Sequence, residues 1–96
     1  MSNVQKNYSQ SSDAQTLYIK EALAKVNLAV NVLAALGLTV LSVNIKTAKP
    51  KIYIQPGKAC SQLQNVAYKF WPTPQGRRKE SVAHVSDCEV HWEEGA

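Results

Sequence analysis

The sequence contains few cysteines, and this shortage excludes two classes of protein. Its two cysteines, Cys60 and Cys88, form no pair at the C-x-x-C spacing of structural zinc sites. Two are also too few for the disulfide framework of a small secreted domain, so we expect reduced, buried thiols with Cys60 packed near Cys88. A single disulfide between them stays open if their Cα atoms lie within about 7 Å. His84 and His91 could join the two cysteines as zinc ligands, but His91 would face away from Cys88 on an extended strand. The sequence therefore predicts no metal and no other cofactor.

The sequence also lacks a charged lead followed by an apolar run, so no secretory leader is predicted. One uncharged stretch, residues 26–45, is long enough to raise the question of a membrane span. Asn27, Asn31 and Gly37 interrupt it, and its pattern changes from helical to alternating near Gly37. We therefore expect no membrane segment.

Most of the aliphatic residues lie in residues 13–36, which are typical of one long amphipathic helix. Ser12 and Gln15 have the spacing of a capping box at its start, and Gly37 can adopt the left-handed conformation that ends a helix. Apolar residues recur at steps of three and four and predict one broad buried face. That face comprises Ile19, Ala22, Leu23, Val26, Ala29, Val30, Leu33 and Leu36.

Two further apolar residues of this segment, Leu28 and Val32, lie off that face. Their position leaves few polar residues for solvent in the second half of the helix. We therefore expect Leu28 and Val32 to form an interface, and the chain to be a homo-oligomer.

Residues after Gly37 alternate with the period of strands. Leu41, Val43 and Ile45 predict the inward face of a first strand, and Ile52 and Ile54 that of a second, over residues 51–55. Residues 58–64 fit one turn of helix. A third strand, residues 65–71, is predicted to point Val66, Tyr68 and Phe70 inward and to end at Pro72.

The last strand shows a change of phase. Ala83 and Val85 alternate on odd positions, whereas Cys88, Val90 and Trp92 alternate on even ones. A β-bulge near residues 86–87 would place both sets on the core face.

Taken together, these patterns predict a polar disordered arm over residues 1–11 and one α+β domain over residues 12–96. In that domain a long N-terminal helix packs on a four-stranded antiparallel sheet.

Charges are segregated along the chain. No acidic residue occurs between Ala22 and Lys79, a span with nine lysines and arginines, whereas residues 80–96 hold five acidic residues and no lysine or arginine. Such a distribution favours a basic surface that attracts an anionic partner. The alternative is that the acidic strand pairs with a basic strand, so that the charges complement each other across the ladder.

Two sets of residues are candidates for binding. Lys51, Tyr53, Lys69 and Trp71 are predicted to face outward on the second and third strands, where aromatic rings could stack on bases beside cations that hold phosphates. Those aromatic residues could equally cover a sheet edge or an interface. The second set is the basic triplet Arg77, Arg78 and Lys79, which follows two prolines and a glycine at or just past a hairpin tip. We predict that this triplet supplies the main functional contact.

No catalytic constellation is evident, so we expect the protein not to be an enzyme. The basic triplet with His84 invites comparison with toxin ribonucleases, but no general base is identifiable.

The C-terminal half resembles a group of short bacteriophage and prophage proteins. The matching segments are Pro56 to Cys60, Ala67 to Trp71, Arg77-Arg78 and Asp87 to Glu94, after a helix that ends in Leu36-Gly37-Leu38. This resemblance implies a non-catalytic accessory protein acting in the cytoplasm of a bacterial host. The leading hypothesis is binding of nucleic acid or a nucleoprotein complex. The alternative is an inhibitor of a bacterial defence system, such as an anti-CRISPR protein, that works by protein contact.

Overall fold

The computed structural model describes residues 10–95 of the 96-residue chain. The elements in order are helix α2 (Gln10–Ala35), strands β1 (Val40–Asn44) and β2 (Lys51–Ile54), a 3-10 helix η1 (Lys58–Gln62), and strands β3 (Ala67–Thr73), β4 (Gly76–Val85) and β5 (Cys88–Gly95). The predicted α+β class with one long helix is confirmed. The predicted arm, residues 1–11, lies outside the described residues except for Gln10 and Ser11, which are helical.

Helix α2 ends as the sequence predicts. Gly37 has a φ of 83°, its N–H donates to the carbonyl of Ala34, and the N–H of Leu38 donates to the carbonyl of Leu33. These two bonds form a Schellman motif, which satisfies carbonyls that the helix would otherwise leave unpaired. The predicted start was wrong. Ser12 already lies within the helix and so cannot be its N-cap residue.

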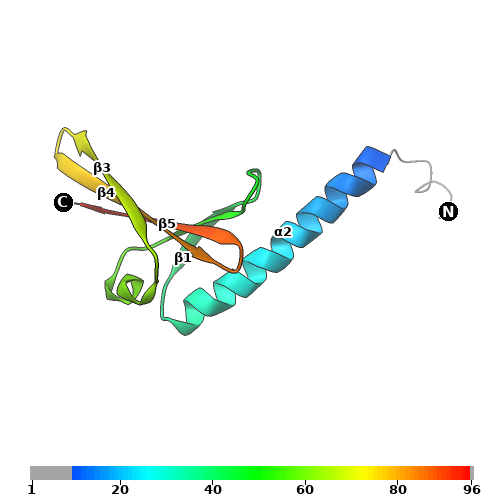
Figure 1. The fold of residues 1–96 in the computed structure, drawn as a ribbon, viewed down its shortest axis with the longest axis horizontal. Coiled ribbons are helices and arrows are strands. Elements are labelled where there is room, and N and C mark those ends of the chain that lie inside the picture. The colour runs from blue at the N-terminus through cyan, green and yellow to red at the C-terminus, as the bar shows by residue number, and fades with distance from the viewer. Residues whose placement is uncertain (1–9, 96) are drawn as a thin grey trace.

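The sheet has five strands in the order β1-β2-β5-β4-β3, which corrects the predicted four-stranded antiparallel sheet. Neighbouring strands are antiparallel except for β2 and β5, which run parallel. The C-terminal segment inserts between two hairpins, β1-β2 and β3-β4. Figure 1 shows the helix beside this sheet and the β3-β4 hairpin extending from it.

The change of phase near residues 86–87 comes from a tight turn, and the predicted β-bulge was wrong. Ser86 and Asp87 both have positive φ, 49° and 64°, as the two central residues of a type I′ hairpin turn require. The turn pairs Val85 with Cys88 and Ala83 with Val90. Odd residues of β4 and even residues of β5 therefore share one face, and the predicted fourth strand is in fact two strands.

The core lies between the helix and one face of the sheet. Ile52 and Ile54 point inward, as predicted, and both are almost completely buried. The complete buried cluster is Val26, Ala29, Leu33, Leu38, Ile52, Ile54, Cys60, Leu63, Ala83, Cys88, Val90 and Trp92. The predicted helical turn, η1, covers the same face through Cys60 and Leu63.

Several residues that we expected in the core are exposed. Leu41 and Val43 are exposed because β1 is an edge strand and a register shift between Val40 and Ser42 interrupts its alternation. Tyr68 and Phe70 are exposed because β3 is the opposite edge strand and belongs to the extended hairpin. Leu23 on the helix is also exposed. For Val43, Tyr68 and Phe70 the alternation was read correctly, but no element of residues 10–95 covers these side chains, whereas Leu41 lies at the register shift itself.

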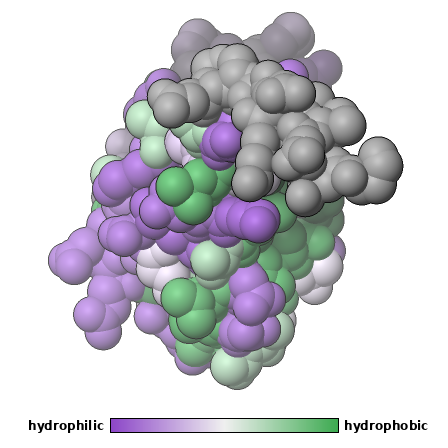
Figure 2. All heavy atoms as spheres, turned by 90° about the vertical axis from the view of Figure 1, so that its right-hand side faces the viewer, coloured by the Kyte–Doolittle hydropathy of each residue, from purple (hydrophilic) through white to green (hydrophobic). Residues whose placement is uncertain are grey.

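The helix is longer than the sheet that it covers. Its 26 residues span about 39 Å, and its N-terminal half projects past the sheet (Figure 1). Tyr18 connects this half of the helix to the loop between β1 and β2. Its hydroxyl donates to the carbonyl oxygen of Thr47 at 2.6 Å, and the carbonyl oxygen of Ile45 lies at 3.2 Å. We call this contact the tether. Viewed from that end, hydrophobic and hydrophilic side chains alternate over the surface (Figure 2). Within residues 10–95, no helix has an apolar stretch long enough to cross a membrane.

Candidate binding surface

Within residues 10–95, no helix covers one face of the sheet, and we call this face the open face. Because side chains alternate along a strand, the residues next to Ile52, Val90 and Ala83 point away from the core. The cross-strand register then assigns to the open face Lys51, Tyr53, Lys69, Trp71, Arg78, Glu80, Val82, His84, Glu89, His91 and Glu93.

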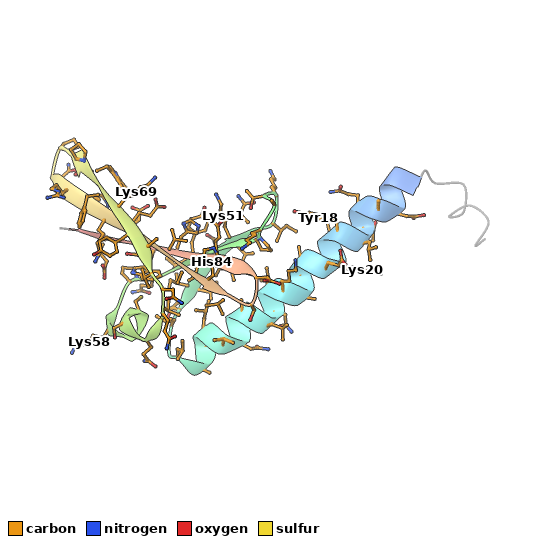
Figure 3. All side chains as sticks on the ribbon, viewed as in Figure 1. Tyr18, Lys20, Lys51, Lys58, Lys69 and His84 are labelled. Carbon is orange, nitrogen blue, oxygen red and sulfur yellow. The ribbon has the colours of Figure 1, made fainter. Side chains whose placement is uncertain are left out.

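Five of the seven residues predicted to bind a partner lie on this face. Lys51 and Tyr53 come from β2, Lys69 and Trp71 from β3, and Arg78 from β4. Lys51 and Lys69 lie on the side of the sheet away from Lys58, which belongs to η1 (Figure 3). The fold therefore brings together two predicted sets that are separate in the sequence.

The remaining two predicted residues, Arg77 and Lys79, lie on the other side of the β3-β4 hairpin. The Arg77 guanidinium carbon is 4.4 Å from the Phe70 ring centre, and Lys79 Nζ is 5.1 Å from the Tyr68 ring centre. The two rings pack edge to face at 5.9 Å. We call these four residues the hairpin cluster. The sequence did not predict this cluster, because the alternation of Tyr68 and Phe70 is that of core residues.

Cross-strand carboxylates accompany the cations. Lys69 Nζ is 3.9 Å from Glu80, Arg78 Nε donates to Glu93 at 3.3 Å, and Lys79 Nζ is 3.2 Å from Glu94. The alternative interpretation of the charge segregation is thus correct for this part of the sheet: basic and acidic strands pair. Exposed pairs of this kind contribute about 0–1 kcal/mol to stability. The cations can therefore exchange these carboxylates for another anion at little cost.

A histidine that we did not select forms the floor of the open face. His91 is largely buried, its Nε2 lies 3.0 Å from Glu89 Oε1, and its ring centre is 5.3 Å from that of Tyr53. Its Nδ1 is 3.5 Å from Glu80 Oε2, with no hydrogen bond formed within the described residues. The bond from His91 lowers the pKa of the Glu89 carboxyl. The His91 ring thus lies between the carboxylates of Glu89 and Glu80 and packs against the ring of Tyr53.

An open groove of about 410 Å³ runs over this floor. It is lined by Lys51, Tyr53, Ala67, Tyr68, Lys69, Glu80, Val82 and His91. His91, Val82 and the carboxylate Glu80 lie in the middle of the groove, on β5 and β4, and the lysines lie at its sides, on β2 and β3. It can accept a flat ring against Tyr53 and a negative charge beside Lys51 or Lys69.

The thiols and histidines do not form a reactive site. Burial raises the pKa of both Cys60 and Cys88, and both side chains lie in the core. Cys88 and His91 project from opposite faces of β5, as predicted. Among the described residues, no three His, Cys, Asp or Glu side chains are grouped so as to hold a metal ion. His84 is exposed on the open face, away from Arg77 and Lys79, which gives the ribonuclease hypothesis no further support.

Comparison of the chain with family models, with curated proteins and with solved structures finds no match. The resemblance to phage proteins therefore stays a prediction, and the function is inferred from the residues of the surface itself.

Proposed function

We propose that this protein is a non-catalytic binding protein that engages an anionic partner, nucleic acid or a nucleoprotein complex, through the open face. The observation that carries the proposal is the convergence of Lys51, Tyr53, Lys69, Trp71 and Arg78 on that face from three strands. The resemblance to phage accessory proteins supports the same function and the cytoplasm of a bacterial host as its place of action.

The chemistry of the face suits a single strand. Tyr53 and Trp71 present rings on which bases can stack, and stacking contributes about 1–3 kcal/mol per base. Lys69 is largely exposed and only 3.9 Å from Glu80, so it can turn from that carboxylate to a phosphate. Binding by stacking with a few phosphate contacts would be tolerant of sequence.

The carboxylates set a limit on the electrostatic part of binding. On the open face, Glu80, Glu89 and Glu93 equal in number the cations Lys51, Lys69 and Arg78. Three phosphate contacts on a single strand predict a slope of about −2 in log K against log salt. We expect this shallow slope, because the face is close to neutral overall.

The test is fluorescence anisotropy with a labelled single-stranded oligonucleotide over a range of salt. Tyr53→Ala and Trp71→Ala should each weaken binding at least about fivefold, because each removes a stacking ring. Phe70→Ala, an exposed aromatic of the hairpin cluster that does not line the groove, is the matched control and should leave the affinity unchanged. Absence of oligonucleotide binding at low salt would exclude nucleic acid as the partner.

A second candidate is inhibition of a bacterial defence enzyme by protein contact, and the balanced charge of the open face favours it. Tyr, Trp and Arg are the residues that dominate the energetics of protein interfaces, and the face presents Tyr53, Trp71 and Arg78. Capture of a protein from bacterial lysate distinguishes the two. A defence protein captured after nuclease treatment and lost with Trp71→Ala would support this candidate, whereas capture that requires nucleic acid would support the first.

A further inference from the structure

Helix α2 carries a second stripe on the side turned away from the sheet. It consists of residues spaced alternately by four and three, which is the spacing of one coiled-coil seam. The stripe comprises Leu17, Glu21, Ala24, Leu28, Asn31 and Ala35, all of them exposed. The buried residues Ala22, Val26, Ala29 and Leu33 lie on the opposite side of the helix. The stripe is therefore free to contact another helix without disturbing the core.

The order of residues along the stripe is complementary to its own reverse. In one antiparallel register, Leu17 lies opposite Ala35, and Ala24 lies opposite Leu28. Each such layer combines a large side chain with a small one, as close packing of two helices requires. Between these layers Glu21 lies opposite Asn31, whose amide can donate to the carboxylate. Large residues thus meet small ones, and polar residues meet polar ones.

A parallel pairing of the same stripe is unfavourable. It would place Glu21 against Glu21, which is a like-charge contact. It would also place Leu28 against Leu28 and Ala24 against Ala24, so wide layers of two leucines would alternate with narrow layers of two alanines. We propose that a second copy of this chain packs its α2 antiparallel against the first, in the register that sets Ala24 opposite Leu28. The stripe then occupies the middle of a symmetric dimer, and the two sheets lie on its outer sides.

The flanking positions refine the proposal. Val32 lies beside the seam and packs near Tyr18 of the second copy, so both predicted interface residues, Leu28 and Val32, belong to the contact. Lys25 lies beside the two-fold axis, where it faces Lys25 of the second copy. This repulsion is exposed to solvent and limits affinity without preventing association. The open faces stay accessible, so dimer formation is independent of the function proposed above.

The first test is a size swap followed by sedimentation velocity. Leu28→Ala should weaken the dimer at least about tenfold, because it leaves a gap opposite Ala24 in two symmetric layers. Ala24→Leu should weaken it by crowding the same layers. The double variant Ala24→Leu with Leu28→Ala restores one large and one small residue per layer and should recover most of the affinity.

These substitutions lie on the exposed side of the helix, so the far-UV circular dichroism spectrum should not change. A wild-type chain that sediments as a monomer at every concentration would overturn the proposal. A double variant no better than the worse single variant would overturn the register.

The second test uses Lys25, which faces Lys25 of the second copy. Lys25→Glu alone exchanges one like-charge pair for another and should leave the homodimer weak. A mixture of wild type and Lys25→Glu should instead form heterodimers above the statistical half, as read by native mass spectrometry. A matched mixture of wild type and Lys20→Glu should give the statistical half, because Lys20 does not face itself in this register. Statistical mixing in the Lys25 experiment would contradict the antiparallel arrangement.

Discussion

Arg77 and Arg78 are adjacent in the chain and lie on opposite faces of the β3-β4 hairpin. The Arg77 guanidinium lies over the Phe70 ring, whereas Arg78 donates to Glu93 on the open face. The basic triplet therefore does not act as one cluster, since alternation along β4 divides it between two surfaces. Substitution of Arg77 and substitution of Arg78 remove the same charge from different faces. Comparing the two variants therefore shows which face binds the partner.

We predict that Arg78→Ser weakens partner binding and that Arg77→Ser does not. The first removes a cation beside Trp71 on the proposed binding face, and the expected loss is about fivefold or more. Anisotropy or capture assays measure it, with thermal unfolding as the check that both variants are folded. Equal losses from the two substitutions would instead assign the contact to the hairpin tip as a whole.

A second prediction concerns the tether between the helix and the β1-β2 loop. Tyr18→Phe deletes the hydroxyl that donates to Thr47 and should cost about 1 kcal/mol of unfolding free energy. For a chain of this size that corresponds to a fall of about 4–8 °C in Tm. Tyr68→Phe, at a largely exposed site, is the control and should leave Tm unchanged. A Tyr18→Phe variant as stable as the wild type would mean that the tether does not hold the loop.

A third prediction follows from the turn between β4 and β5. Both Ser86 and Asp87 hold positive φ, which glycine and asparagine adopt more readily. Replacing them with Asn-Gly should stabilise the protein by about 1 kcal/mol in denaturant titrations. Ser86→Pro should have the opposite effect and destabilise it by several kcal/mol, because the proline ring cannot adopt that φ. No difference between these two variants would contradict the turn geometry.

A fourth prediction concerns acid stability. The hydrogen bond from His91 lowers the pKa of Glu89 in the folded protein. The stabilisation from this carboxylate is therefore fully present above the unfolded value of about 4.3, and it is lost as the pH falls through the lower folded value. Glu89→Gln should give a smaller loss of unfolding free energy on acidification from about pH 5. Parallel stability curves for wild type and variant would show that Glu89 makes no such contribution.

The parts of the fold that depend on local sequence were predictable. Gly37 ends the helix because its conformation is a property of one residue, and Ile52 and Ile54 are buried because strand alternation is local. The two thiols were also placed correctly on the core side. Each of these outcomes depends on a pattern within a few residues.

The predictions that were wrong concern which secondary-structure elements are neighbours in the fold. Ser86 and Asp87 can form a bulge or a turn, and only the pairing of Val85 with Cys88 decides between them. Tyr68 and Phe70 have the alternation of a buried strand, but the layer that would bury them does not reach the hairpin. For the same reason the sequence did not reveal the hairpin cluster. His91 was considered only as a metal ligand, because nothing in the sequence places Glu80 beside it.

Both edges of the sheet carry an interruption. On β3, Pro72 lies within the strand that it was predicted to end, and it has no N–H to donate to a strand that approaches from outside. On β1, the register shift between Val40 and Ser42 breaks the regular row of donors and acceptors. Each feature opposes the addition of a further strand. The sheet is thus protected against growth into fibrils by edge-to-edge aggregation, even though its two edge strands expose Leu41, Val43, Tyr68 and Phe70 to solvent.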